Sequence, residues 1–270
     1  MSTVLCMTDC CMFFGSFYIG VNKMHIYLTL RANGKLEIPL QYNHMVQAAI
    51  YGAIAPELAA FLHDRGFRSG SRRFTLFAFS RLTGRFRIDK EKGTISFEDE
   101  AKLVVTSPVD EFCQSVANGM LTKGGIRLGR CEAEVEKMSV RQFKVDGERV
   151  MLRTLSPVVV YSTLLRPDGR KYTCYFQPGE PDYELLVGNN LRKKYRAFYG
   201  KDAPAGELQV RRLGQVRQHV LSYKGTVIKG YSGRLVLTGP AELLQMAVDA
   251  GLGSKNGQGF GCVEVVGGQA

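Results

Sequence analysis

The chain of 270 residues has no tryptophan and only four histidines, and its 25 acids are outnumbered by its bases. Aromatic packing and any stacking on bases must therefore come from its 15 Phe and 12 Tyr. Its seven cysteines include no Cys-x-x-Cys pair, and no His lies at zinc-ligand spacing from a cysteine pair, so no structural zinc is expected. An odd, scattered set of cysteines argues against a disulfide framework and indicates a reducing, cytoplasmic location.

Long hydrophobic runs are also missing. The apolar stretch from Cys11 to Val21 is shorter than the roughly 20 residues that span a bilayer, and no basic segment precedes it as in a signal peptide. We therefore expect no membrane partner. Residues 1–23 are treated as an N-terminal extension of uncertain status, with Met24 as the hypothetical functional start. The alternative is a short hydrophobic tail that docks on the body of the protein.

Positive charge is the dominant feature of the composition. The 36 Lys and Arg give a net charge of +11 and a pI near 9.4, which suits a polyanionic partner such as nucleic acid or an anionic membrane. Residues 64–87 contain seven arginines and one acid, and residues 191–201 contain five basic residues, three aromatics and no acid. Such patches can neutralise phosphates and stack on bases. The alternative for residues 191–201 is a solvated helix face with its aromatics in the core.

The periodicity of apolar residues predicts the same order of elements twice. The first half reads as a strand, a helical region broken at Pro56, two strands, a helix and a strand, at residues 24–32, 43–66, 73–79, 85–98, 108–121 and 126–138. The second half reads as a strand followed by a hairpin across Pro167-Asp168-Gly169, a helix, two strands, a helix and a strand, at residues 151–161, 181–199, 206–222, 224–237, 240–250 and 260–266.

This strand, helix, strand, strand, helix, strand order is the split βαββαβ unit. Two copies predict an α+β protein with two tandem ferredoxin-like (RRM-like) domains. We place the first domain at residues 24–145 and the second at residues 146–270. No sequence repeat is visible between the two halves, so this prediction depends on element order.

The most specific local signal is a glycine-rich loop at residues 251–261, GLGSKNGQGFG, between the last helix and the last strand. Glycines let backbone amides approach a phosphate closely, and Lys255 adds a positive charge. The loop is neither a Walker loop nor a dinucleotide fingerprint, because the required Gly-Lys-Ser/Thr ending and third glycine are absent. The alternative is a flexible connector. The predicted RNA-binding residues are Gly251, Gly253, Lys255, Gly257, Gly259, Gly261, Arg68, Arg73, Arg192 and Lys193.

This loop resembles that of the repeat-associated RNA-binding proteins of CRISPR systems. Three stretches resemble one branch of them, the CRISPR-associated protein six endoribonucleases: IPLQYNHMVQAAIYGAI at 38–54, LAAFLHDRGF at 58–67 and TLSPVVV at 154–160. The resemblance covers nearly all of residues 24–268 in order, and residues 1–23 have no counterpart in it. It implies a metal-independent nuclease of antiviral defence that cuts CRISPR repeat precursor RNA into guide RNAs. The partners implied are the repeat RNA and other effector-complex subunits, and we expect a monomer or a homodimer.

Cutting RNA without a metal ion requires that a 2′-hydroxyl attack the adjacent phosphate and leave a 2′,3′-cyclic phosphate. One group must take a proton, another can donate one, and a cation must stabilise the phosphorane. The resemblance places these roles on His63, Tyr51 and Arg72, with Arg68 and Arg73 as competitors for the basic role. A helix C-terminus favours a protonated imidazole at His63, although without the resemblance a simple capping residue is the favoured interpretation. Tyr51 could instead place its ring in the core.

Two other functions stay open on the residues alone. The chain could be a catalytically inactive RNA-binding subunit of an effector complex, because the glycine-rich loop and the basic patches would serve that purpose equally well. It could also be a small-molecule enzyme on a ferredoxin-like scaffold. No cofactor or metal ion is expected, since Asp and Glu are dispersed and form no cluster typical of a two-metal nuclease.

Overall fold

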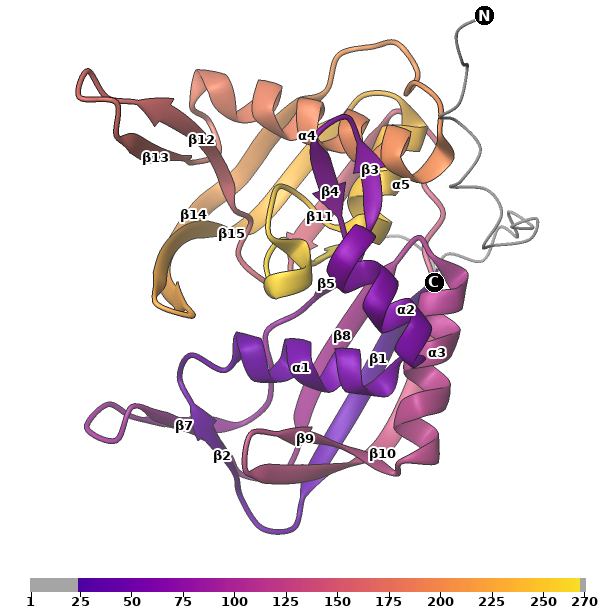
Figure 1. The fold of residues 1–270 in the computed structure, drawn as a ribbon, viewed down its shortest axis with the longest axis vertical. Helices are drawn as coiled ribbons and strands as arrows, with labels where there is room; N and C mark the ends of the chain where they lie inside the picture. The colour runs from indigo at the N-terminus through magenta and orange to yellow at the C-terminus, as the bar shows by residue number, and fades with distance from the viewer. Residues whose placement is uncertain (1–23, 268–270) are drawn as a thin grey trace, which may run out of the picture.

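The computed structural model describes residues 24–267 and contains two main antiparallel sheets (Figure 1). The first sheet has five strands in the spatial order β5-β8-β1-β10-β9. These strands are β1 (Met24–Ala32), β5 (Ala78–Phe79), β8 (Ala101–Ser107), β9 (Gly125–Leu128) and β10 (Cys131–Gln142). The central strand β1 pairs with β8 on one side and with β10 on the other. With helices α1 (Asn43–Ala53) and α3 (Asp110–Thr122), the chain order β1-α1-β5-β8-α3-β10 is a βαββαβ unit.

The second sheet repeats this topology. Its order is β14-β15-β11-β16. The strands are β11 (Arg149–Thr154), β14 (Gln209–Tyr223), β15 (Thr226–Thr238) and β16 (Val263–Val265), and the helices are α4 (Pro181–Tyr199) and α5 (Ala241–Ala250). The order β11-α4-β14-β15-α5-β16 is again βαββαβ, with β11 between β15 and β16. The predicted class, α+β with two tandem ferredoxin-like units, is confirmed.

Further elements are inserted into the connections of the two units. Between α1 and β5 lie α2 (Pro56–Ala60), the π-helical turn η1 (Phe61–Arg65) and a hairpin of β3 (Phe67–Ser69) and β4 (Arg72–Phe74). A small sheet of β2 (Leu36–Pro39), β7 (Thr94–Phe97) and β6 (Phe86–Asp89) lies beside the first unit. The predicted hairpin across residues 167–169 joins β12 (Val160–Leu165) to β13 (Lys171–Phe176). The glycine-rich loop contains the 3₁₀ turn η2 (Asn256–Gln258).

One continuous core joins the two units. On β1 the apolar residues Ile26, Leu28 and Leu30 are buried at alternate positions, as a strand with one face on a core requires. The same cluster of buried side chains includes Leu152 of β11 and Leu244 of α5. The glycine-rich loop, drawn in yellow between the two sheets, lies at the junction of the units (Figure 1).

The sequence interpretation was wrong about several strands. Residues 73–79 are not one strand, because buried Leu76 adopts a φ of +50° and separates β4 from β5. Residues 85–98 form the β6–β7 hairpin, whose turn is held by the Asp89 carboxylate accepting hydrogen bonds from two backbone amides. The third strand of the first unit is instead β8, which the sequence analysis missed.

Two more predicted strands are each divided in two. Residues 126–138 fall in the β9–β10 hairpin, which turns at Gly129 with a φ of +66°. Residues 151–161 are split between β11 and β12 by a loop, and the last strand is shorter than predicted. Within residues 24–267 no helix is long and apolar enough to cross a membrane. The hypotheses about residues 1–23 lie outside the described residues.

Candidate functional site

The glycine-rich loop is a tightly folded structure, held from within by one side chain. Asn256 Nδ2 donates hydrogen bonds to the carbonyl oxygens of Leu252, at 2.9 Å, and Phe260, at 3.1 Å. A Cβ on Gly261 would lie 1.9 Å from the Leu252 oxygen, and one on Gly253 would lie 2.4 Å from the Val159 oxygen. These glycines are therefore required by the packing of the loop on itself and on the chain beside β12, whatever the loop binds.

A pocket of about 700 Å³ opens between the two units beside this loop. Its first wall, as we call it, consists of α1, η1 and β4 from the first unit, and its second wall consists of α4 and the glycine-rich loop from the second unit. The basic residues that line it are Arg72, Arg73, Lys193, Lys194 and Lys255, together with His63. Asp64 is the only acid among the described residues that line it. Such a cavity suits a ligand with several negative charges.

His63 lies on η1 at the end of the second helical segment, and its side chain is 81% exposed. Its Nδ1 lies 2.7 Å from Oδ1 of Asp64, a hydrogen bond that orients the ring. Its Nε2 forms no hydrogen bond with any residue in 24–267 and can reach a ligand in the pocket. A π-helical turn at this position is an irregularity typical of functional sites.

Tyr51 reaches the pocket from α1, two turns beyond Asn43. Its ring meets that of Phe77 edge to face, with centroids 5.9 Å apart, so the ring is anchored while the residue still lines the cavity. Burial raises the pKa of Tyr51, and the nearby Arg73 guanidinium only partly opposes this shift. The phenol therefore stays protonated at neutral pH and can donate a hydrogen bond.

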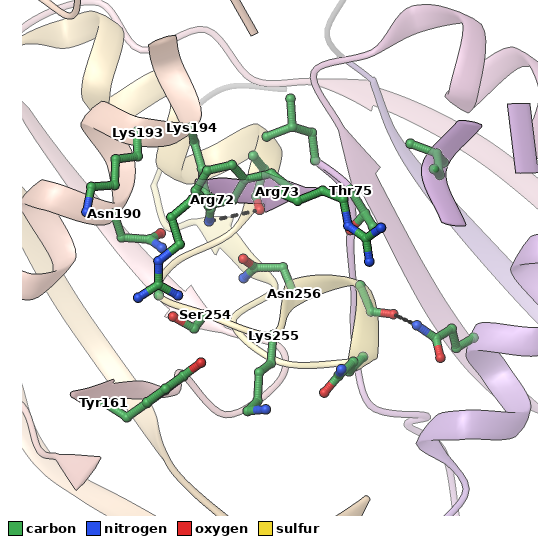
Figure 2. Close-up of a pocket in the computed structure, with 18 of the residues that line it drawn as sticks. Arg72, Arg73, Thr75, Tyr161, Asn190, Lys193, Lys194, Ser254, Lys255 and Asn256 are labelled. Carbon is green, nitrogen blue, oxygen red and sulfur yellow. Dashed lines mark hydrogen bonds between the residues drawn. The ribbon is translucent and has the colours of Figure 1, made fainter. Parts of the chain in front are cut away.

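The three candidate arginines lie in different surroundings. Arg73 Nη1 donates to the backbone oxygen of Asp64 at 2.7 Å, which ties the β4 strand to η1. Arg72 makes no such bond within the described chain, and its side chain extends toward Ser254 of the glycine-rich loop (Figure 2). Arg68 does not line the pocket. Of the three, Arg72 is the one whose guanidinium is available to a phosphate in the cavity.

The predicted RNA-binding residues divide in the same way. Lys193, Gly253, Lys255 and Gly257 line the pocket, whereas Gly251, Gly259 and Gly261 are buried behind it. The Lys255 ammonium lies 5.6 Å from the ring centroid of Tyr161, a cation–π contact that holds the lysine over the loop. The Arg192 guanidinium lies outside the pocket and donates to the carbonyl oxygen of Gly206.

One polar face of α1 was missed by the sequence analysis. Asn43 Nδ2 donates to the Gln258 oxygen at 2.9 Å, and Gln47 Nε2 donates to the Gly257 oxygen at 2.7 Å. Gln47 Oε1 also accepts a hydrogen bond from the Tyr223 hydroxyl at the end of β14. The spacing of positions 43, 47 and 51, four residues apart, was the available signal that these side chains share a helix face.

The arrangement of His, Cys, Asp and Glu side chains bears on whether the protein could bind a metal ion. Among residues 24–267, no three His, Cys, Asp or Glu side chains gather in a geometry that could hold a metal ion. The pocket itself offers one imidazole, one carboxylate and several cations. The chemistry available there is proton transfer and stabilisation of negative charge.

Comparison with known proteins links both units to one family. Residues 37–139 match the family described as CRISPR-associated protein Cas6, N-terminal, and residues 138–265 match CRISPR associated protein Cas6, C-terminal. The chain is 28% identical over 246 residues to CRISPR-associated endoribonuclease Cas6 1 of Methanocaldococcus jannaschii, which covers 89% of this chain and 92% of that protein. It is 26% identical to CRISPR-associated endoribonuclease Cas6 of Pyrococcus furiosus, over 86% of this chain and 84% of that protein.

Solved structures agree with the sequence matches. A structure titled CRISPR associated protein Cas6 superposes with a TM-score of 0.74 at 27% identity, covering 91% of this chain and 100% of the other. A Cas6-related protein from Pyrococcus furiosus superposes with a TM-score of 0.79 at 22% identity, covering 92% of this chain and 100% of the other, and supports the fold alone. The tandem arrangement seen here is therefore shared across the full length of these proteins.

Proposed function

The chain belongs to the Cas6 family, and we propose that it is an endoribonuclease that cuts CRISPR repeat RNA in the pocket between its two units, without a metal ion. The observation that carries this proposal is the composition of the first wall. An imidazole, a phenol and a guanidinium reach one cavity from η1, α1 and β4, although the residues are separated in the sequence. Two curated relatives that match over most of this chain are named endoribonucleases.

The proposed reaction begins with attack of a ribose 2′-hydroxyl on the neighbouring phosphorus. The 2′-hydroxyl gives its proton to solvent water as its oxygen bonds to phosphorus, the bond to the 5′-oxygen of the next nucleotide breaks, and the products carry a 2′,3′-cyclic phosphate and a 5′-hydroxyl. We assign proton donation to the leaving 5′-oxygen to His63, whose ring is oriented by the Asp64 carboxylate 2.7 Å from its Nδ1. The protonated phenol of Tyr51 donates a hydrogen bond that orients the reacting phosphate or ribose.

Arg72 supplies the positive charge that stabilises the phosphorane. Its guanidinium can form two parallel hydrogen bonds with phosphate oxygens, which makes it a suitable residue for this role. Lys193 and Lys255 on the second wall then hold neighbouring phosphates and align the strand. The first wall thus supplies proton transfer and charge stabilisation, and the second wall positions the RNA strand.

The test uses RNA that carries one CRISPR repeat from the genome that encodes the protein. We expect cleavage at one position in excess EDTA, with a 2′,3′-cyclic phosphate identified by mass spectrometry. A substrate with a 2′-deoxy nucleotide at that position should bind and stay intact, because the attacking hydroxyl is missing. Activity that disappears in EDTA and returns with a divalent cation would contradict the proposal. Tight binding without any cleavage would favour the inactive RNA-binding subunit.

A further inference from the structure

Lys194 of α4 is the most unusual charged residue that the structure describes. It is 2% exposed, whereas its neighbours Lys193 and Arg196 on the same helix are exposed. Lysine is rarely buried to this degree unless an acid pairs with it. No residue in 24–267 forms an ion pair with Lys194, so its charge has no acidic partner in this part of the chain.

The contacts of Lys194 place it directly beneath the glycine-rich loop. Its Nζ donates a hydrogen bond to the Gly251 oxygen at 2.6 Å and lies 3.4 Å from the Ala250 oxygen. Ala250 is the last residue of α5, and Gly251 is the first residue of the loop. Figure 2 shows the side chain reaching from α4 toward the loop, behind the pocket that it helps to line.

The charged and titratable side chains that line the pocket with Lys194 are positive or neutral, apart from Asp64 and His63 on η1. Arg72 and Arg73 come from β4, Lys193 from its own helix, Lys255 from the loop, and Tyr161 from β12. The carbonyl groups at the end of α5 favour a positive charge, but only through partial charges.

The acids near these elements are engaged elsewhere. On η1, Asp64 is hydrogen-bonded to His63 at 2.7 Å. On α5, the Asp249 carboxylate accepts hydrogen bonds from Gln245 at 3.0 and 3.1 Å and lies 3.7 Å from His25. Neither carboxylate is therefore the partner of Lys194.

We propose that a phosphate of the bound RNA supplies the negative charge that Lys194 lacks, so that RNA binding takes up a proton at Nζ of this lysine. The inference rests on the proposed function for the identity of the polyanion. It assigns Lys194 a role through the loop: once charged, the ammonium holds the Gly251 carbonyl and favours phosphate in the pocket above. Lys194 is thus a positioning residue and not one that transfers a proton to the substrate.

The direction of the pH dependence follows from burial. Burial lowers the pKa of Lys194 from 10.5 to about 7, so the free protein holds this lysine largely neutral above neutral pH. Phosphate favours the charged form and raises the pKa in the complex. Below pH 7 the lysine is charged in both states and binding is independent of pH. Above pH 7 binding must take up a proton, so Kd rises by up to about tenfold per pH unit until the pKa of the complex is reached.

Calorimetry at pH 8 tests this inference in two buffers with different ionisation enthalpies. The protein carries His63→Ala, which is expected to slow cleavage and removes an imidazole from the pocket, and the probe is RNA with one CRISPR repeat of the same genome. We expect uptake of roughly 0.5 to 1 proton per RNA bound. Phosphodiesters and ordinary histidines contribute little at this pH, because they titrate well below it.

Two substitutions on α4 form a matched pair. Lys194→Met should abolish proton uptake and make Kd independent of pH between 7 and 9, and Lys194→Arg should also abolish uptake while keeping the affinity. Lys193→Met removes an exposed lysine one position away, so it should weaken binding while leaving proton uptake unchanged. Uptake that persists in Lys194→Met would overturn the inference.

Proton uptake measured on the protein that keeps Lys194 tests the inference even if the Lys194 variants fail to fold. Tight RNA binding with no proton uptake at pH 8 overturns the role of Lys194 and leaves the proposed nuclease intact, provided that the protein with His63 cleaves. Proton uptake on binding without any cleavage by that protein supports Lys194 and overturns the nuclease. Failure to bind the repeat RNA at all overturns both.

Discussion

The two walls of the pocket come from units with the same strand order but from different connections within them. In the first unit, α2, η1 and the β3–β4 hairpin are inserted between α1 and β5, and the first wall includes His63 and Arg72 from these insertions. In the second unit the equivalent connection, from α4 to β14, contains no helix or strand; the β12–β13 hairpin is inserted before α4 instead, and the loop between α5 and β16 is elaborated. A shared fold therefore positions two different kinds of surface.

The walls also differ in how firmly they are held. The first wall presents exposed side chains on short elements, such as the five-residue turn η1 and the three-residue strand β4. The second wall contains the long helix α4 and a loop whose buried glycines leave no room for a Cβ beside neighbouring backbone atoms. We therefore expect substitutions in the first wall to slow cleavage without weakening RNA binding. Substitutions in the second wall should weaken RNA binding or destabilise the loop itself.

The largest effect is expected for His63→Ala. Removing the proton donor should slow cleavage by about 10²–10⁴-fold while RNA affinity stays nearly unchanged. Single-turnover cleavage and a separate binding titration measure the two quantities. His44→Ala is the matched control, because His44 is bonded to the Gln41 oxygen at 3.0 Å and does not line the pocket. Full activity in the His63 variant would remove the basis for calling the first wall the site of proton transfer.

The next largest effect is expected for Gly261→Ala in the second wall. Gly261→Ala places a Cβ 1.9 Å from the Leu252 oxygen at a φ of +68°, so the loop must rearrange. We expect a loss of about 2–4 kcal/mol in the free energy of unfolding, from backbone strain and overpacking together, and weaker RNA binding. Urea denaturation measures the first quantity and a binding titration the second.

Gly225→Ala separates strain from overpacking. Gly225 has a similar φ of +79°. Apart from its two neighbours in the chain, however, no described residue has an atom within 4 Å of a Cβ added there. This variant should lose only about 1–2 kcal/mol from the left-handed conformation and should bind RNA normally. Equal losses in the two variants would show that the loop is less rigid than its packing indicates.

The second wall was easier to predict from the sequence than the first. Its glycine pattern is continuous in the chain, so residues 251–261 could be recognised as one feature before any fold was known. All five glycines of the loop were predicted to contact RNA, however, whereas Gly251, Gly259 and Gly261 are buried behind the pocket. Which face of a loop meets the ligand depends on tertiary packing, and the local sequence does not encode it.

The arrangement of the first wall could not be predicted from local sequence patterns. His63, Tyr51 and Arg72 were selected by resemblance, and their meeting in one cavity depends on the turn at Gly66 and the β3–β4 hairpin. No local pattern indicated that Leu76 would break the strand, because an apolar residue at a φ of +50° contradicts its usual preference. The missed strand β8 carries the apolar run Leu103-Val104-Val105, which was the signal for a buried strand.

Gln47 joins the two walls, and its replacement tests whether they act together. Gln47→Ala removes the hydrogen bonds to the Gly257 oxygen and from the Tyr223 hydroxyl. We expect cleavage to slow by up to about thirtyfold, because two hydrogen bonds of about 1 kcal/mol each position Tyr51 on the same helix against the loop. Single-turnover rates at saturating RNA measure this effect, and Kd should change much less.

Gln41→Ala is the control for that variant. Gln41 accepts a hydrogen bond from the Ser222 amide at 3.0 Å, so it holds the same end of β14 without touching the glycine-rich loop. Its replacement should leave the cleavage rate unchanged. If both glutamine variants are equally slow, the β14–β15 hairpin and not the contact between the walls controls the position of Tyr51.

The smallest effect is expected for Lys255→Ala, in the binding of RNA. An exposed ion pair contributes up to about 1 kcal/mol, so Kd should rise roughly fivefold and the slope of log Kd against log salt should fall by about one. Lys90→Ala provides a control with the same loss of charge in the β6–β7 turn, outside the pocket. Lys255→Arg should restore the slope, because the charge returns over Tyr161. An equal change in slope for the Lys90 and Lys255 variants would mean that RNA senses the net charge of the protein and that the second wall holds no phosphate at Lys255.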